Sequence, residues 1–335
     1  MRITPELLRK LALEHVNKRL NQPNDIVAVY LTGSVLGEEP LLGGTTDIDL
    51  VIVHKEDPPI EREIVRISYE ISLDIVHHHQ SYYSFHRRLR LNPWLGYALC
   101  NHDSILYDTD HWLEFIQAGV YAQFQRPENI YGRALPLVEK ARSIWFEIES
   151  PQEHEPLSWF DAFFKAVGLA ANAVAVLNGP ALPTRRFLLE LPARTESAGK
   201  PGLFDAVLGL MGINQITAER CAEWRQTWEE AITAASKQPT CPPNLLSARK
   251  SYFTMSCDAM LESGNHQAAS WMMLETWLQA VEVLWQKPIQ RETWLSLLNE
   301  LGFEPQTYEA HTAALDAFLD ISEQILDEYK SNFGL

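Results

Sequence analysis

Hydrophobic and polar positions follow one pattern in the first third of this chain and another in the rest. Before about residue 110, short runs of aliphatic and β-branched residues alternate with helical stretches. These runs predict strands at residues 26–31, 47–53, 71–76 and 104–107. Thr4 and Pro5 predict a helix start, with Thr4 as the N-cap and Pro5 at the first helical position. Pro58 and Pro59 are interpreted as opening a short helical segment that runs through Tyr69.

Only helical periodicity follows after about residue 120. We expect helices near residues 131–148, 158–178, 203–211, 217–236, 244–263, 266–286, 291–301 and 307–330. The clearest pattern is an apolar stripe at helical spacing, formed by Trp271, Leu274, Leu278, Val281 and Trp285. Such a stripe is typical of a bundle core rather than of a ligand cage. The chain is therefore predicted to be α+β, with helices and strands in residues 1–118 and an all-α bundle in residues 119–335.

Composition narrows the class of partner. The 335 residues include 28 Lys and Arg against 44 Asp and Glu, a net charge of −16. An acidic surface repels a phosphate backbone, which disfavours a nucleic-acid partner but allows a nucleotide in one local pocket. The four cysteines form no CxxC pair, which predicts reduced thiols in a cytoplasmic protein. The longest apolar run, around LFDAVLGLMGI, is shorter than the ~18 residues that span a bilayer, so no membrane partner is expected. The oligomeric state is left open.

The candidate chemistry begins with an Asp-Ile-Asp triplet in the second predicted strand. Side chains alternate across a strand, so Asp47 and Asp49 emerge on one face, roughly 7 Å apart, while Ile48 points to the other. Two such carboxylates repel each other unless a divalent cation such as Mg²⁺ lies between them. In the next predicted strand, Asp74 stands on the face opposite to Leu73. If the two strands are neighbours, three carboxylates converge at one place.

A turn of small residues, Gly33-Ser34, ends the first predicted strand. Glycine lets a phosphate approach the backbone, and Ser34 adds a hydroxyl and an N–H as donors. Each feature alone is more often an ordinary turn or a solvated loop. Together, the turn and the carboxylates are what two-metal nucleotidyl transfer requires. One metal lowers the pKa of the attacking hydroxyl, and the other neutralises the phosphates that leave as pyrophosphate.

The stretch LTGSVLGEEPLLGGTTDIDLVIV, followed by ISLDIV, resembles the DNA polymerase β-like nucleotidyltransferase superfamily. That superfamily has an apolar residue, Gly, then Gly or Ser, a spacer, Asp-apolar-Asp-apolar, and a third acidic residue on a later strand. By this resemblance, Gly33 and Ser34 match the phosphate-binding turn. Asp47 and Asp49 match the metal ligands, and Asp74 matches the third carboxylate. The specific match covers residues 26–76, and its spacer is at the long end.

Within that superfamily, a small catalytic domain followed by a helical domain is most similar to the aminoglycoside and other small-molecule nucleotidyltransferases. The resemblance implies a polymerase β-like domain with a mixed sheet, which binds Mg²⁺ or Mn²⁺. The implied reaction moves a nucleoside monophosphate, AMP from ATP, to a hydroxyl of a small polar acceptor. Asp74 is then a metal ligand or the general base, and both roles stay open. Two alternatives remain: a non-catalytic regulatory module of the toxin–antitoxin type that binds nucleotide, and a transferase directed to RNA or protein.

Two basic pairs are further candidates. The densest basic cluster, FHRRLR, follows the third predicted strand, and Arg88 and Arg90 are its candidates for binding the triphosphate. The alternative is a solvated helix face. Arg185 and Arg186 are expected to form ion pairs within the helical domain rather than to reach a site.

Three consecutive histidines end the third predicted strand. Because adjacent side chains alternate across a strand, only His77 and His79 of the run His77-His78-His79 share a face, and no acidic or cysteine partner follows them. We therefore expect exposed histidines at a strand end rather than a metal site.

Overall fold

The computed structural model describes residues 3–149 and 155–335, which fall into two units. The N-terminal unit comprises Met1–Arg126 and Leu246–Ala259, and the helical unit comprises Pro127–Leu245 and Met260–Leu335. This division differs from the predicted boundary between residues 118 and 119. Helix α4 (Trp112–Tyr121) packs with the sheet and extends the first unit, and a segment from far along the chain, residues 246–259, also belongs to it.

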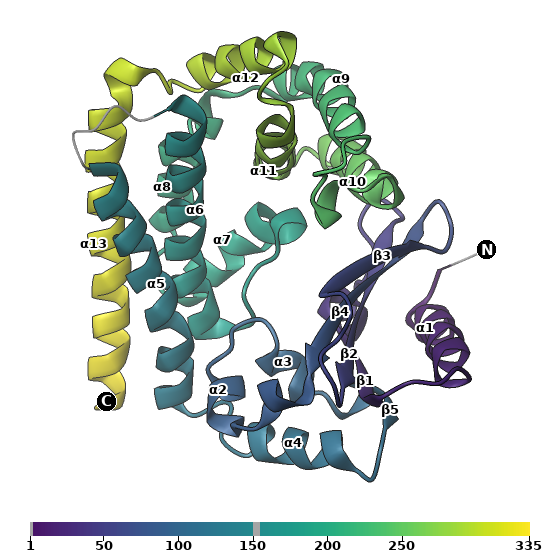
Figure 1. The fold of residues 1–335 in the computed structure, drawn as a ribbon. Helices are drawn as coiled ribbons and strands as arrows, with labels where there is room; N and C mark the ends of the chain where they lie inside the picture. Colours follow the sequence, from purple (N-terminus) through teal and green to yellow (C-terminus); the bar gives the residue numbers. More distant parts are fainter. Residues whose placement is uncertain (1–2, 150–154) are drawn as a thin grey trace. The chain divides into compact units, whose positions relative to one another are not determined.

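A mixed sheet forms the centre of the N-terminal unit (Figure 1). Within the described residues it has five strands: β1 (Ile26–Thr32), β2 (Thr46–His54), β3 (Arg62–Arg66), β4 (Ile71–His79) and β5 (Ile105–Asp108). Their order across the sheet is β3-β4-β2-β1-β5. Strands β2 and β4 run parallel, and the other neighbours are antiparallel. Together with the helical unit, this sheet confirms the α+β class.

Strand β3 corrects a prediction, whereas the other described strands lie where the sequence predicts them. The segment after Pro58 and Pro59 is a strand rather than a helix, and it pairs antiparallel with β4. Its central residues, Ile64 and Val65, are β-branched and favour a strand. Pairing with β4 therefore outweighs the helix signal of the prolines.

Helices cover both faces of the sheet (Figure 1). Helix α1 (Pro5–Leu20) lies on one face and packs against Ile48, Leu50 and Ile52 of β2. Helices α2 (His86–Arg90), α3 (Gly96–Leu99) and α4 lie on the opposite face and pack against Val51 and Val53. Odd-numbered residues of β2 thus face α2–α4, and this alternation places Asp47 and Asp49 on that side of the sheet.

The start of α1 has the predicted cap. Pro5 is the first helical residue, and Oγ1 of Thr4 accepts a hydrogen bond from the backbone N–H of Leu7 at 3.3 Å. Short 3₁₀ helices connect many of the larger elements. They are η1 (Gly33–Leu36), η2 (Gln80–Tyr83), η3 (His102–Ser104), η4 (Val176–Asn178), η5 (Thr184–Arg186), η6 (Ile213–Gln215), η7 (Pro243–Leu245), η8 (Ser247–Arg249) and η9 (Pro305–Thr307).

The helical unit contains the helices that the sequence predicts, together with α7 in the stretch that follows Arg185 and Arg186. They are α5 (Pro127–Glu149), α6 (Pro156–Ala175), α7 (Phe187–Ser197), α8 (Gly202–Leu210), α9 (Ala218–Ala235), α11 (His266–Leu284), α12 (Pro288–Glu300) and α13 (Tyr308–Phe333). Helix α10 (Lys250–Glu262) begins in the N-terminal unit. Helix α13 lies alongside α5 (Figure 1). Of the tryptophan stripe, Trp271 is buried and Trp285 is half-buried, which supports a core role.

One apolar helical stretch corrects a second prediction. Among the described residues, Pro156–Asn178 is long and apolar enough to cross a membrane, with a mean hydropathy of 1.6 in its most apolar window. The expectation that no apolar run approaches this length is therefore wrong. However, 72% of the window is buried within the protein, including Phe160, Phe163 and Val167. Core helices of helical bundles have the same composition, so the stretch is weak evidence for a membrane segment.

Candidate functional site

The three predicted carboxylates lie on one face of the sheet. In the parallel pairing of β2 with β4, Asp49 is opposite Asp74, and Asp47 is opposite Ser72. Because paired positions share a face, all three carboxylates point to the side that carries α2–α4. Asp47 is 1% exposed and Asp74 is 3% exposed, whereas Asp49 is half-buried. The Oγ of Ser72 also donates a hydrogen bond to Oδ1 of Asp47. Asp47 and Asp74 are therefore shielded from solvent, and Asp49 is partly accessible to it.

The Gly33-Ser34 turn lies directly against this cluster. Thr32, the last residue of β1, pairs with Asp49, and the chain turns into η1 at the next residue. Gly33 has a φ of +68° and is exposed, and a Cβ at this position would lie 2.0 Å from Oδ2 of Asp49. Only glycine accommodates both the left-handed backbone and this close approach. The hydroxyl of Ser34 donates to the carbonyl oxygen of Pro40 at 3.3 Å, which ties the turn to the loop that follows it.

Two arginines that the sequence analysis does not single out bind the carboxylates. Arg62 of β3 forms a bidentate pair with Asp74, through Nε at 2.7 Å and a terminal nitrogen at 2.5 Å. One terminal nitrogen of Arg249, in η8, lies 2.8 Å from Oδ2 of Asp74, and the other is ion-paired with Oδ2 of Asp47. The first arginine lies in a strand predicted as a helix. The second lies about 175 residues beyond Asp74, and no local pattern connects it to the site.

The charges of the cluster act on both arginines. Burial lowers the pKa of the Arg249 guanidinium, but the charges of Asp47, Tyr252 and Asp74 outweigh it, and the pKa is raised overall. The hydrogen bond to Asp74 is the main cause of the raised pKa of Arg62. Both guanidiniums therefore stay charged, and they neutralise carboxylates that would otherwise repel one another.

The donor set fits a hard divalent ion in its chemistry, but arginine holds part of it. Carboxylate oxygens are the ligands that Mg²⁺ prefers in proteins, and Asp47, Asp49 and Asp74 provide them from adjacent positions. In the arrangement seen here, no group of three His, Cys, Asp or Glu side chains within the described ranges is placed to hold a metal ion. Arg249 is ion-paired with two of the three carboxylates in this arrangement.

The other basic candidates have structural partners. Arg90 donates to the carbonyl oxygen of Gly119 at 2.6 Å and to Oε1 of Gln123 at 2.8 Å, so it fastens α2 to α4. Arg88 is exposed, and its guanidinium carbon lies 5.0 Å from the ring centre of Phe85. Neither of these contacts involves a carboxylate of the cluster, and the role of Arg88 and Arg90 in binding a triphosphate stays a prediction.

Arg185 and Arg186 lie in η5 of the helical unit. Arg186 pairs with Glu190 at 3.8 Å, and Arg185 is buried. The Arg186 pair agrees with the expected ion pairing inside the helical domain.

The three histidines of β4 form hydrogen bonds with different partners. His77 is 7% exposed and shares hydrogen bonds with His54 and Glu63, each at 2.9 Å. His78 bonds to the hydroxyl of Tyr83, and His79 bonds to Ser81 and to the backbone near the end of β2. The expectation of exposed histidines is therefore wrong: His77 is buried, and His78 and His79 are half-buried. His77 points to the α1 face, where hydrogen bonds to His54 and Glu63 replace water.

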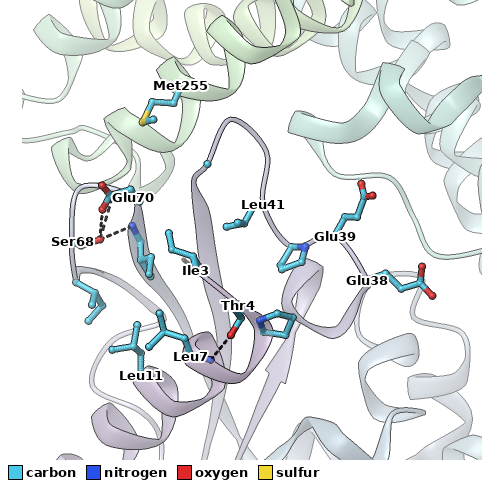
Figure 2. Close-up of a pocket in the computed structure, with 15 residues that line it drawn as sticks. Ile3, Thr4, Leu7, Leu11, Glu38, Glu39, Leu41, Ser68, Glu70 and Met255 are labelled. Carbon is cyan, nitrogen blue, oxygen red and sulfur yellow. Dashed lines mark hydrogen bonds between the residues drawn. The ribbon is translucent and has the colours of Figure 1, made fainter. Parts of the chain in front are cut away.

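A pocket of about 880 Å³ lies elsewhere in the N-terminal unit (Figure 2). It opens between the start of α1, residues 38–44 and residues 67–71, with Met255 at one end. Leu7 and Leu11 contribute apolar surface, and Glu38 and Glu70 contribute acidic groups. None of the three sheet carboxylates lines it. The pocket and the carboxylate cluster are therefore different sites.

Glu275 in the helical unit is an acid with a raised pKa. Glu275 of α11 is half-buried and accepts a hydrogen bond from Oγ1 of Thr184 at 2.8 Å. Burial raises the pKa of Glu275 to about 7, although the hydrogen bond acts in the opposite direction. The sequence analysis does not single this residue out, because a glutamate within an apolar stripe carries no local sign of its protonation state.

No protein-family model matches this chain, and no curated protein matches it significantly. Function is therefore inferred from the chemistry of the site itself.

Proposed function

We propose that this protein is a metal-dependent nucleotidyltransferase. It moves a nucleoside monophosphate, AMP from ATP, to a hydroxyl of a small polar acceptor and releases pyrophosphate. The observation that carries the proposal is the placement of Asp47, Asp49 and Asp74 in register on neighbouring strands. An exposed left-handed glycine, Gly33, lies against the middle carboxylate. Carboxylates beside an open backbone turn combine a cation site with a phosphate site.

Each residue has a defined role in this proposal. Asp47, Asp49 and Asp74 hold Mg²⁺ or Mn²⁺, which neutralises phosphate charge and activates the acceptor hydroxyl when bound. Gly33 lets the phosphates approach the backbone, and Ser34 donates to them through its N–H, or through its hydroxyl once that group leaves the carbonyl oxygen of Pro40. Arg88 and Arg90 are not needed for this assignment.

One observation favours a second candidate, a nucleotide-binding regulatory module without catalysis. Arg249 is ion-paired with Asp47 and lies 2.8 Å from Asp74, so a charge of this chain already satisfies two of the three carboxylates. A site that never binds metal has this arrangement permanently, whereas an enzyme must exchange the arginine for a metal. An RNA acceptor is less favoured, because the net charge of −16 repels a phosphate backbone.

The test is direct. The full chain is incubated with each labelled nucleoside triphosphate and Mg²⁺ or Mn²⁺, together with aminoglycosides, RNA or protein as acceptors. Mass spectrometry then identifies every product. We expect a metal-dependent mass increase of one nucleoside monophosphate on a small acceptor.

Matched variants separate the site from nonspecific effects. Asp49→Asn is expected to reduce transfer by orders of magnitude. The control is Asp57→Asn, at an exposed aspartate outside the cluster, and it should retain the activity of the unmodified chain. Nucleotide binding without transfer, in the presence of either metal and all acceptors, would favour the regulatory module instead.

A further inference from the structure

Arg249 occupies the position where the carboxylate cluster needs a cation. Its side chain is 8% exposed, and its guanidinium contacts Oδ2 of Asp47 and Oδ2 of Asp74, the latter at 2.8 Å. Behind it, the guanidinium carbon lies 4.8 Å from the ring centre of Tyr252 and 5.5 Å from that of Phe253. A single arginine thus bridges β2 and β4 by charge and stacks on the helix that follows it.

The backbone that carries Arg249 is anchored independently of this charge. A Cβ at Gly43 would lie 2.1 Å from the carbonyl oxygen of Met255, so the loop before β2 packs closely on α10. Oγ1 of Thr45 donates to the carbonyl oxygen of Tyr252 at 3.4 Å, and Ser256 donates to the carbonyl oxygen of Leu42 at 3.3 Å. These contacts hold α10 without involving the charge of Arg249.

Arg249 and a divalent ion require the same oxygens. A divalent ion bound by these aspartates would draw on the carboxylate oxygens that the guanidinium of Arg249 now neutralises, Oδ2 of Asp47 and Oδ2 of Asp74. The two cations would be only a few ångströms apart, in a buried place where solvent screens their repulsion poorly. Simultaneous occupation of Asp47 and Asp74 is therefore unfavourable.

We propose that Arg249 is a resident counter-ion that competes with the divalent metal for Asp47 and Asp74. The metal binds fully only when the guanidinium withdraws. This inference rests on the proposed function, because it takes the three aspartates as metal ligands.

The competition has two consequences of opposite sign. Without Arg249, the buried carboxylates Asp47 and Asp74 lose a partner, which destabilises the metal-free protein. The same loss removes one of the two guanidiniums at the cluster, which strengthens metal binding at Asp47 above all, since Arg62 still pairs with Asp74. A merely structural salt bridge has the first consequence and not the second.

The experiment compares Mn²⁺ affinity and thermal stability in full-length variants. Arg249→Gln removes the competing charge, and Arg249→Lys keeps a charge without the bidentate geometry. Arg220→Gln is the matched control, since Arg220 forms a bidentate pair with Glu300 in the helical unit, at 2.5 and 2.7 Å. Calorimetry measures the Mn²⁺ dissociation constant, and unfolding is followed with and without Mn²⁺.

We expect Arg249→Gln to bind Mn²⁺ at least tenfold more tightly than the unmodified chain. It should also melt at a lower temperature without metal and recover more of its stability when Mn²⁺ is added. Arg249→Lys should show the same changes to a smaller extent, and Arg220→Gln should leave the Mn²⁺ affinity unchanged. If Arg249→Gln does not fold, the unmodified protein still tests whether the metal displaces Arg249. Titration with Mg²⁺ should shift the Nε–H resonance of Arg249, identified by its loss in the Lys variant, and leave that of Arg220 in place.

The outcomes separate this inference from the proposed function. Mn²⁺ affinity that is equal or weaker in Arg249→Gln overturns the competition but leaves the transferase standing. Tighter Mn²⁺ binding without nucleotidyl transfer supports the competition and removes the transferase. The absence of Mn²⁺ binding in both the unmodified chain and Arg249→Gln overturns both proposals.

Discussion

The contact between Gly33 and Asp49 makes a quantitative prediction about the turn that precedes the carboxylate cluster. Gly33→Ala faces two costs. Its φ of +68° is in the left-handed region, which costs a residue with a Cβ about 1–2 kcal/mol. The new Cβ also lies 2.0 Å from Oδ2 and 2.9 Å from Cγ of Asp49, so that side chain must rotate or the turn must shift. Overpacking of this kind costs about 1–3 kcal/mol.

Gly44→Ala isolates the first cost. Gly44 has a φ of +72° and lies in the same connection between β1 and β2, but a Cβ there meets nothing within 4 Å. We therefore expect Gly44→Ala to lose only the left-handed cost and Gly33→Ala to lose about 1–3 kcal/mol more. The free energy of unfolding is measured by urea denaturation of the full chain. Hydrogen exchange of the β2 amides reports specifically on the N-terminal unit.

A double-mutant cycle then tests the cause. Asp49→Ala removes the two carboxylate atoms that would clash, so Gly33→Ala in that background should cost no more than Gly44→Ala. Equal losses for Gly33→Ala and Gly44→Ala in the unmodified background would refute the close contact. A Gly33→Ala loss that Asp49→Ala does not reduce would show that the strain lies elsewhere in the turn.

Three further predictions concern single titratable groups. Asp74→Asn should weaken Mn²⁺ binding and abolish transfer at every pH if Asp74 is a metal ligand, whereas loss of only the acid limb of the pH–rate profile would identify a general base. Glu275→Gln should stabilise the protein at pH 8 by about 1–3 kcal/mol and have little effect at pH 4. The reason is that the pKa of Glu275 is raised to about 7, so the folded state loses stability as the pH rises from 4.5 to 7. Equal stabilisation at both pH values would contradict this. Burial, partly opposed by Glu63, lowers the pKa of His77, so stability should fall as the pH drops below 6.5, and unfolding curves of His77→Gln should lose part of that dependence.

The local sequence pattern predicts much of the fold and the three carboxylates of the site. The aliphatic runs around Ile48 and Leu73 predict two strands, and side-chain alternation then places Asp47, Asp49 and Asp74 on the correct faces. What alternation cannot provide is the order of strands across the sheet, which decides whether those faces meet. Because β2 and β4 are parallel neighbours in the structure, the faces that carry the three carboxylates meet.

Errors occurred where tertiary pairing outweighed a local signal. The prolines before Glu61 favoured a helix, but the edge of β4 offers hydrogen-bonding groups that β3 pairs with. The place of His77 at a strand end, with no acidic partner following the run, predicts exposure, yet its bonds to His54 and Glu63 let it be buried. In both cases, the deciding partner is distant in the sequence.

The sequence predicts the carboxylates of this site but not the arginines that pair with them. The cluster of carboxylates has an open side, where Gly33 is exposed and Asp49 is half-buried, and a closed side, where Arg249 covers Asp47 and Asp74. Asp49 is the most exposed of the three carboxylates and would be the first that a divalent ion binding as proposed could reach. Removal of Asp49 should then weaken the first encounter with the metal, and removal of Arg249 should strengthen the final complex. Variants at these two positions must change Mn²⁺ affinity in opposite directions, although both lose a charge from the same cluster.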